Sequence, residues 1–156
     1  MSERWRKFRR LSHVEQSLVL EAAGALFATW IGLRVFGFRR WKQILAFFIP
    51  ADKTTGGNNA APERELALVI ARMEAAAARN IFLHANCLEQ SLVLWWLLRR
   101  RGIDAALRLG ARKESGTFEA HAWVEWDGEV VNLADREHQH FAPFENPVLS
   151  VETRIE

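Results

Sequence analysis

The stretch "HANCLEQSLVLWWLLRRRGIDA", residues 84–105, decides the fold, because it begins a helix at Cys87, the one cysteine in the chain. Asn86 is a favoured N-cap residue, so its side chain should accept a hydrogen bond from a free amide of the first turn. Apolar residues then recur at near-helical spacing, which predicts a buried helix from Cys87 to Arg101. They are Leu88, Leu92, Trp95, Trp96 and Leu98.

The position of Cys87 in the first helical turn favours a reactive thiol. A thiol there lies near the positive end of the helix dipole, which favours the thiolate. The free amides of the same turn could stabilise an oxyanion during acyl transfer. Taken alone, however, a lone cysteine is more often a buried structural residue than a nucleophile. A nucleophile therefore needs support from the rest of the sequence.

The periodicity changes after this helix. Residues 103–113 and residues 117–126, "TFEAHAWVEW", alternate between apolar and polar side chains, which predicts two strands joined by a turn at residues 115–116. An Asp127-Gly128 turn then leads into "EVVNL". A helix followed by an antiparallel meander indicates an α+β core, with the cysteine helix packed against the sheet.

His121 is the histidine best placed to activate Cys87. It lies in the middle of the strand at residues 117–126, and rigid elements hold catalytic groups more firmly than loops do. A nucleophile at a helix N-terminus with a histidine base on a neighbouring strand is the arrangement expected of a cysteine hydrolase. His84 is the local competitor, as a loop residue or as part of the site lining. The H-x-H pair His138 and His140 is interpreted as a solvated segment rather than a metal site.

A third residue should orient His121, and the hairpin register chooses it. If Asp127-Gly128 is a two-residue turn, Glu125 pairs with Val130 and Asn132 becomes a diagonal neighbour of His121 on the same face. An amide orienter of this kind also occurs in cysteine proteases.

A three-residue loop of Trp126-Asp127-Gly128 would shift that register by one position. His121 would then lie opposite Leu133, and the diagonal neighbour would be Asp135. We favour Asp135, because a carboxylate stabilises an imidazolium directly, and keep Asn132 as the alternative.

The N-terminal part of the chain is predicted to be helical. Ser12 and Glu15 form a capping-box pattern, so a helix should begin near His13. Gly37 should end it, and a second helix should run from residue 38 to residue 49, before Pro50. Residues 51–62, "ADKTTGGNNAAP", have linker composition, and a helix should follow to about residue 79. We therefore divide the chain into a helical region at residues 1–62 and a core at residues 63–156.

Composition narrows the class of protein. With 49% apolar residues, seven Trp and ten Phe in 156 residues, the chain can bury a core and is globular. The net charge is only +2, so the basic character is confined to clusters at residues 4–10, 38–42 and 99–101. Without a nucleic-acid motif we expect contact with an acidic partner surface rather than with nucleic acid.

Compartment and cofactors follow from what the sequence lacks. One cysteine allows no intrachain disulfide, and neither C-x-x-C nor H-E-x-x-H spacing occurs, so we expect a cytoplasmic protein without metal or cofactor. The charge-free run at residues 22–33 is shorter than the roughly 20 residues of a membrane span. We therefore expect an uncleaved helix, with a docking surface for a partner or membrane as the less favoured interpretation.

Several motifs together resemble a known family. Residues 80–145 contain Cys-Leu-x-x-Ser-Leu, Arg-Arg-Gly-Ile-Asp, Leu-Arg-Leu-Gly and Ala-His-Ala-Trp-Val-Glu. This series is similar to the transglutaminase-like B proteins of lasso-peptide biosynthesis, the microcin-processing leader peptidases. The "FRRWK" segment of the N-terminal region is also similar, though more loosely.

The resemblance implies a fold, an activity and a set of partners. The fold would be a transglutaminase-like or papain-like cysteine peptidase core. The activity would be removal of the leader from a ribosomally made precursor peptide, before a separate ATP-dependent cyclase closes the macrolactam. Because no βββααα recognition module is visible near the N-terminus, a separate leader-recognition protein would deliver the substrate.

The resemblance also implies roles for individual residues. Cys87 would be the nucleophile and His121 the base, while the family's acid position falls on Leu133 in this sequence, which keeps both Asp135 and Asn132 open as orienters. We further predict substrate contacts from Asn86, His84 and Trp123.

Overall fold

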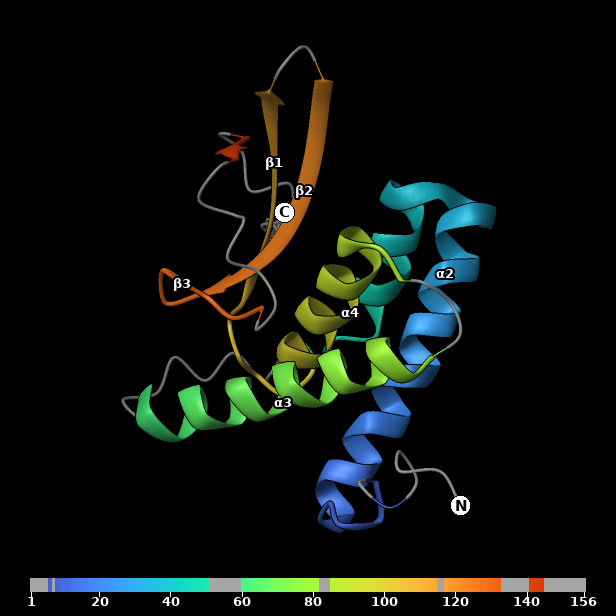
Figure 1. Ribbon diagram of the computed structural model, residues 1–156, viewed down its shortest axis with the longest axis vertical. Helices are drawn as coiled ribbons and strands as arrows, with labels where there is room; N and C mark the ends of the chain where they lie inside the picture. The colour runs from blue at the N-terminus through green and yellow to red at the C-terminus, as the bar shows by residue number, and fades with distance from the viewer. Residues whose placement is uncertain are drawn as a thin grey trace, which may run out of the picture.

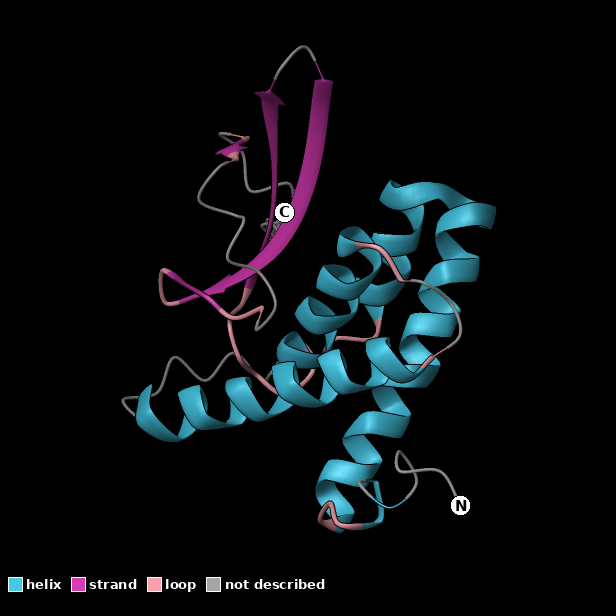
Figure 2. Cartoon of the chain, in the orientation of Figure 1, coloured by secondary structure: helices cyan, strands magenta, loops and turns pink. Residues whose placement is uncertain are grey.

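The molecule has a helical layer and a small antiparallel sheet, which confirms the predicted α+β class (Figure 1). The helix that begins at Cys87 lies between the long N-terminal helix and the sheet, and Figure 2 shows the same division by secondary structure. The computed structural model describes residue 6 and residues 8–50, 60–81, 85–114, 117–132 and 141–144.

The described elements follow the predicted order. The predicted strand at residues 117–126 is found with the same bounds, and the short last strand was not predicted from the sequence. The elements are α2 (His13–Phe47), α3 (Ala60–Asn80), α4 (Cys87–Arg99), β1 (Ala106–Glu114), β2 (Thr117–Trp126), β3 (Glu129–Val130) and β4 (Ala142–Pro143).

The N-terminal helix α2 is broken at Gly37, as the sequence predicts. Gly37 has φ 74°, a left-handed conformation that glycine adopts without a steric penalty. Beyond this break the chain folds back, so that Trp41 Nε1 donates a hydrogen bond to Thr29 Oγ1 at 3.2 Å. The Trp41 ring fills the space where a side chain on Gly32 would be. The predicted capping box of Ser12 and Glu15 is also present.

One buried core joins the N-terminal region to the rest of the chain. Side chains of α2 lie in the same apolar cluster as side chains of α3, α4, β1 and β2. The predicted boundary at residue 62 therefore separates two stretches of sequence that share a core, and most of the predicted linker lies outside the described residues. The α2 members of this cluster are Leu18, Ala22, Leu26 and Leu45.

Helix α2 is also long and apolar enough to cross a membrane by length and composition. The charge-free run at residues 22–33 is shorter than a span, but the whole helix is not. Only 28% of its most apolar window is buried, although Leu18 and Leu26 on one face pack into the core. Core helices of water-soluble proteins meet the same length and composition test.

The sheet has the strand order β3-β2-β1-β4, with antiparallel neighbours throughout. Asp127 and Gly128 both have positive φ, 49° and 76°, which is the conformation of a tight hairpin turn that matches strand twist. Glu125 pairs with Val130 across this turn. The two-residue turn is therefore the one that the chain adopts, and not the three-residue loop from which Asp135 was predicted as the neighbour of His121.

Candidate active site

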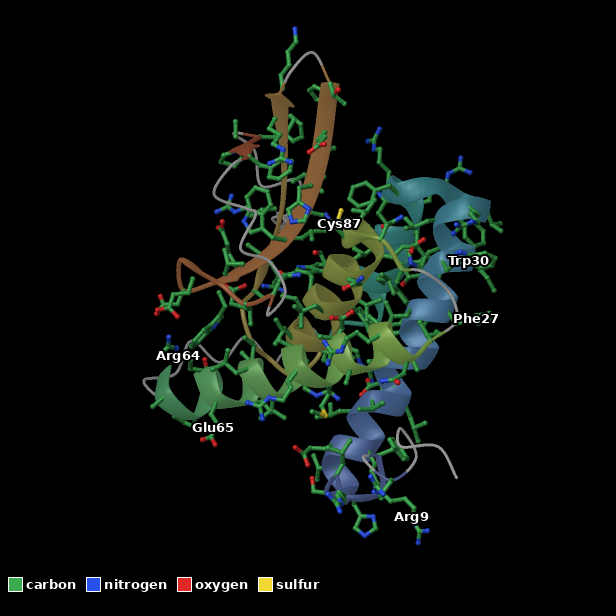
Figure 3. All side chains as sticks on the ribbon, viewed as in Figure 1. Arg9, Phe27, Trp30, Arg64, Glu65 and Cys87 are labelled. Carbon is green, nitrogen blue, oxygen red and sulfur yellow. The ribbon has the colours of Figure 1, made fainter. Side chains whose placement is uncertain are left out.

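Cys87 is the first residue of α4, at a fully capped helix N-terminus. Asn86 Oδ1 accepts a hydrogen bond from the amide of Glu89 at 2.9 Å, and Glu89 Oε2 accepts one from the amide of Asn86 at 3.0 Å. This confirms the predicted N-cap and adds a capping box. Cys87 is half-buried, and Figure 3 shows its sulfur at the N-terminal end of α4. The cap therefore fixes the backbone on which Cys87 lies while leaving part of the thiol accessible.

The carboxylate of Glu89 links this helix terminus to α2. Glu89 is only 2% exposed, and its Oε1 lies 3.2 Å from Arg34 Nη1. The guanidinium of Arg34 also lies over the Trp30 ring, 4.1 Å from its centroid, and donates to the Trp30 carbonyl. A buried carboxylate needs a partner of opposite charge, so α2 contributes directly to the stability of the turn that bears Cys87.

His121 lies on β2 directly opposite Gly110 of β1. Its ring centroid is 5.0 Å from that of Phe141 and 6.2 Å from that of Trp123. A Cβ on Gly110 would lie 2.8 Å from the Trp123 ring and 2.8 Å from the Ala142 carbonyl oxygen. The absence of a side chain at Gly110 therefore makes room for the aromatic rings that bracket the imidazole.

Trp123 is held in this arrangement by a second contact. Its indole Nε1 donates to Glu125 Oε1 at 2.8 Å, and Glu125 Oε2 accepts from Arg108 Nε at 2.8 Å. Trp123 is only 3% exposed. This burial is typical of a side chain that packs beside His121 and supports its position. Direct contact of Trp123 with substrate stays a prediction.

A hydrogen-bond network connects α4 to β2 beside His121. Ser91 Oγ donates to the carbonyl of Ala122 at 2.8 Å. Asn132 Nδ2 donates to Ser91 Oγ at 3.1 Å, and Asn132 Oδ1 accepts from the amide of Val124 at 2.6 Å. The observed partners of the Asn132 side chain are thus Ser91 and Val124.

The structure describes some of the predicted site residues and not others. Cys87, Asn86, His121, Trp123 and Asn132 are described, on α4, on β2 and directly after β3. His84, Asp135, His138 and His140 lie outside the described residues. Which residue orients His121 therefore stays a prediction. Within the described parts of the chain, no group of three His, Cys, Asp or Glu side chains could hold a metal ion.

Four residues of this site were missed by reasoning from the sequence. Glu89 had a local signal, because Asn86 with an acidic residue three positions later is a capping-box pattern. For Ser91 the available signal was a small polar residue in an apolar run, one turn after Cys87. For Gly110 it was a glycine inside a predicted strand, which indicates close approach of another group. Arg34 had no local signal, because its partner is 55 residues away.

A match to a known protein family covers the part of the chain that contains this site. The sequence profile of the transglutaminase-like superfamily matches residues 30–146, which include Cys87, His121, Asn132 and Asp135. The chain belongs to the transglutaminase-like superfamily. The predicted fold and family are thereby confirmed. The match begins inside α2, so the transglutaminase-like region includes the Arg34 contact to Glu89.

One curated relative is similar over a shorter stretch. The microcin J25-processing protein McjB of Escherichia coli is 44% identical over 55 residues, which is 35% of this transglutaminase-like chain. The matched stretch covers 25% of the length of McjB. No solved structure matches the chain.

Proposed function

We propose that this chain is a cysteine peptidase that removes the leader from a ribosomally made lasso-peptide precursor before the macrolactam is closed. The observation that carries this proposal is the position of Cys87, half-exposed at a capped helix N-terminus on the helix that is bonded to the His121 strand. Membership of the transglutaminase-like superfamily and similarity to a microcin-processing protein support it.

The proposed reaction is acyl transfer through a thioester. His121 takes the proton of the Cys87 thiol, and the thiolate attacks the carbonyl carbon at the end of the leader. His121 then gives the proton to the departing amine of the core peptide. Water, deprotonated by His121, attacks the thioester, releases the leader as a carboxylate and restores the thiol.

The first turn of α4 supplies hydrogen-bond donors for the oxyanion. The amide of Glu89 bonds to Asn86 Oδ1, and the amide of Gln90 bonds to the Asn86 carbonyl at 3.0 Å. Because the amides of Glu89 and Gln90 already have acceptors, we assign the amides of Cys87 and Leu88 as the donors that bind the substrate oxyanion. Asp135, or alternatively Asn132, would orient His121, and His84, Asn86 and Trp123 would contact the peptide.

The proposed reaction implies partners and a compartment. The precursor peptide is the substrate, a separate leader-recognition protein delivers it, and a lasso cyclase uses the product. Because the nucleophile is a free thiol, the reaction belongs in the reducing cytoplasm. No cofactor is needed for this chemistry.

A non-catalytic scaffold subunit of the same biosynthetic complex is the second candidate, motivated by Leu133 at the family's acid position. Thiol alkylation separates the two candidates, since an unactivated thiol reacts slowly below neutral pH whereas a histidine-paired thiolate stays reactive. A different transglutaminase-like acyl transfer is the third candidate. It would place an added amine in the product.

Peptide cleavage tests the proposal directly. The protein is incubated with a precursor peptide and the recognition protein, and the products are separated by mass. The wild-type chain should release the leader and Cys87→Ala should release none. Full cleavage by Cys87→Ala would rule the proposal out.

A further inference from the structure

We infer that Ser91 is a positioning residue which, together with Asn132, sets the place of His121 relative to Cys87. The inference rests on the proposed function, because it concerns the same thiol and imidazole. It is drawn from a polar network, buried at Ser91 and partly buried at Asn132, whose members belong to three different parts of the fold.

Ser91 lies on the same face of α4 as Cys87. The two residues are four positions apart, so their side chains are neighbours along one helical face, about 6 Å apart along the axis. Ser91 is fully buried, and its hydroxyl donates to the carbonyl of Ala122, the residue that follows His121. One hydrogen bond therefore joins the α4 face that bears Cys87 to the residue next to His121 on β2.

Asn132, in the residues that follow β3, completes the network. The amide of Val131 donates to the Val124 carbonyl at 2.9 Å, as in an ordinary antiparallel ladder. The amide of Val124, however, donates to the Asn132 side chain, whose Nδ2 donates in turn to Ser91 Oγ. The β3 end of the hairpin is thus bonded to α4 through a side chain rather than through the main chain.

The polarity of this contact matters for position. Apolar packing between a helix and a sheet tolerates small sliding, because it has no preferred direction. A buried hydroxyl between a carbonyl and an amide fixes distance and direction, since leaving any of these groups unpaired costs about 1–3 kcal/mol. Ser91 therefore fixes the position of α4 along β2. It thereby also fixes the distance between the Cys87 thiol and the His121 imidazole.

The test uses the fact that Cys87 is the only thiol. Alkylation by iodoacetamide is followed at about pH 6, where an unactivated thiol is almost entirely protonated. Ser91→Ala should react about tenfold more slowly than the wild-type chain. In a His121→Ala background, Ser91→Ala should have no further effect, because its action passes through His121.

Thr29→Val is the matched control. It also removes a fully buried hydroxyl that takes part in a hydrogen bond, but its partner is Trp41 on the folded-back end of α2. It should alter thermal stability to a similar extent and leave the alkylation rate at pH 6 unchanged. Asn132→Ala removes the other side chain of the network and should also slow alkylation, as Ser91→Ala does.

Three results would overturn the inference. If His121→Ala slows alkylation but Ser91→Ala and Asn132→Ala do not, Ser91 has no positioning role while the proposed peptidase stands. If the Ser91→Ala effect persists in full without His121, the serine acts on the helix alone. If the wild-type thiol reacts slowly at pH 6 and His121→Ala changes nothing, the proposed function fails, and the inference fails with it.

Discussion

Arg34 on α2 forms an ion pair with the buried carboxylate of Glu89, whose second oxygen holds the backbone amide next to Cys87. The N-terminal helix is thereby part of the structure that supports the turn bearing Cys87. This agrees with a superfamily match that begins at residue 30, well before the predicted core.

Removing Glu89 should weaken the whole fold. Glu89→Ala leaves the Asn86 amide without its side-chain acceptor and Arg34 without its carboxylate, so we expect a loss of about 2–4 kcal/mol in the free energy of unfolding. Urea denaturation measures it. Arg39→Gln changes an exposed arginine beyond the break in the same helix and should cost less than about 0.5 kcal/mol. Equal losses for the two variants would show that the contact contributes nothing.

Gly110→Ala should disturb the surroundings of His121. The new Cβ would collide with the Trp123 ring and the Ala142 carbonyl oxygen, so we expect a loss of about 1–3 kcal/mol and slower leader cleavage. Gly24→Ala is the control, because nothing lies within 4 Å of its Cβ position in α2. That change should stabilise the helix by about 0.5–1 kcal/mol. Wild-type cleavage by Gly110→Ala would show that the Trp123 position is irrelevant to the reaction.

Glu74 on α3 makes stability depend on pH. It is 3% exposed, and burial raises its pKa from 4.5 to about 8. Between these values the folded chain keeps a proton that the unfolded chain loses, so stability falls as pH rises through this window. Glu74→Gln removes the titrating group. Its advantage over the wild-type chain should therefore grow from small at about pH 5 to roughly 3–5 kcal/mol above pH 8.

Denaturation curves at several pH values measure this effect. Glu65→Gln, an exposed change on the same helix, should alter stability by less than about 0.5 kcal/mol at every pH. A Glu74→Gln difference that is constant from pH 5 to pH 8 would contradict the burial of an ionisable carboxyl at this position.

Local chemistry made part of this structure predictable. The cap at Asn86 and the break at Gly37 are each decided by a few adjacent residues, and the structure contains both. The sequence left two hairpin registers open at Asp127-Gly128, and the observed one is not the register that accompanied the preference for Asp135. The Ser91 contact to Asn132 spans 41 residues. Such a contact depends on how α4 packs on the hairpin, which the local sequence pattern does not encode.

The residue that orients His121 could not be decided from the local sequence pattern either. The observed turn is the one that favours Asn132, yet the Asn132 side chain bonds to Ser91 and Val124. Asp135 lies outside the described residues, so the choice between the two is still a prediction. Asp135→Asn and Asn132→Ala, compared in the cleavage assay, would identify the residue on which the reaction depends.

The most direct test of the central claim is the intact mass of the protein after acid quenching during cleavage of a precursor peptide. The peptidase mechanism predicts a fraction of the chain carrying the leader as a thioester, mapped to Cys87 by digestion and absent from Cys87→Ala. Release of the core peptide by Cys87→Ala at the wild-type rate, with no adduct on the wild-type chain, would contradict it.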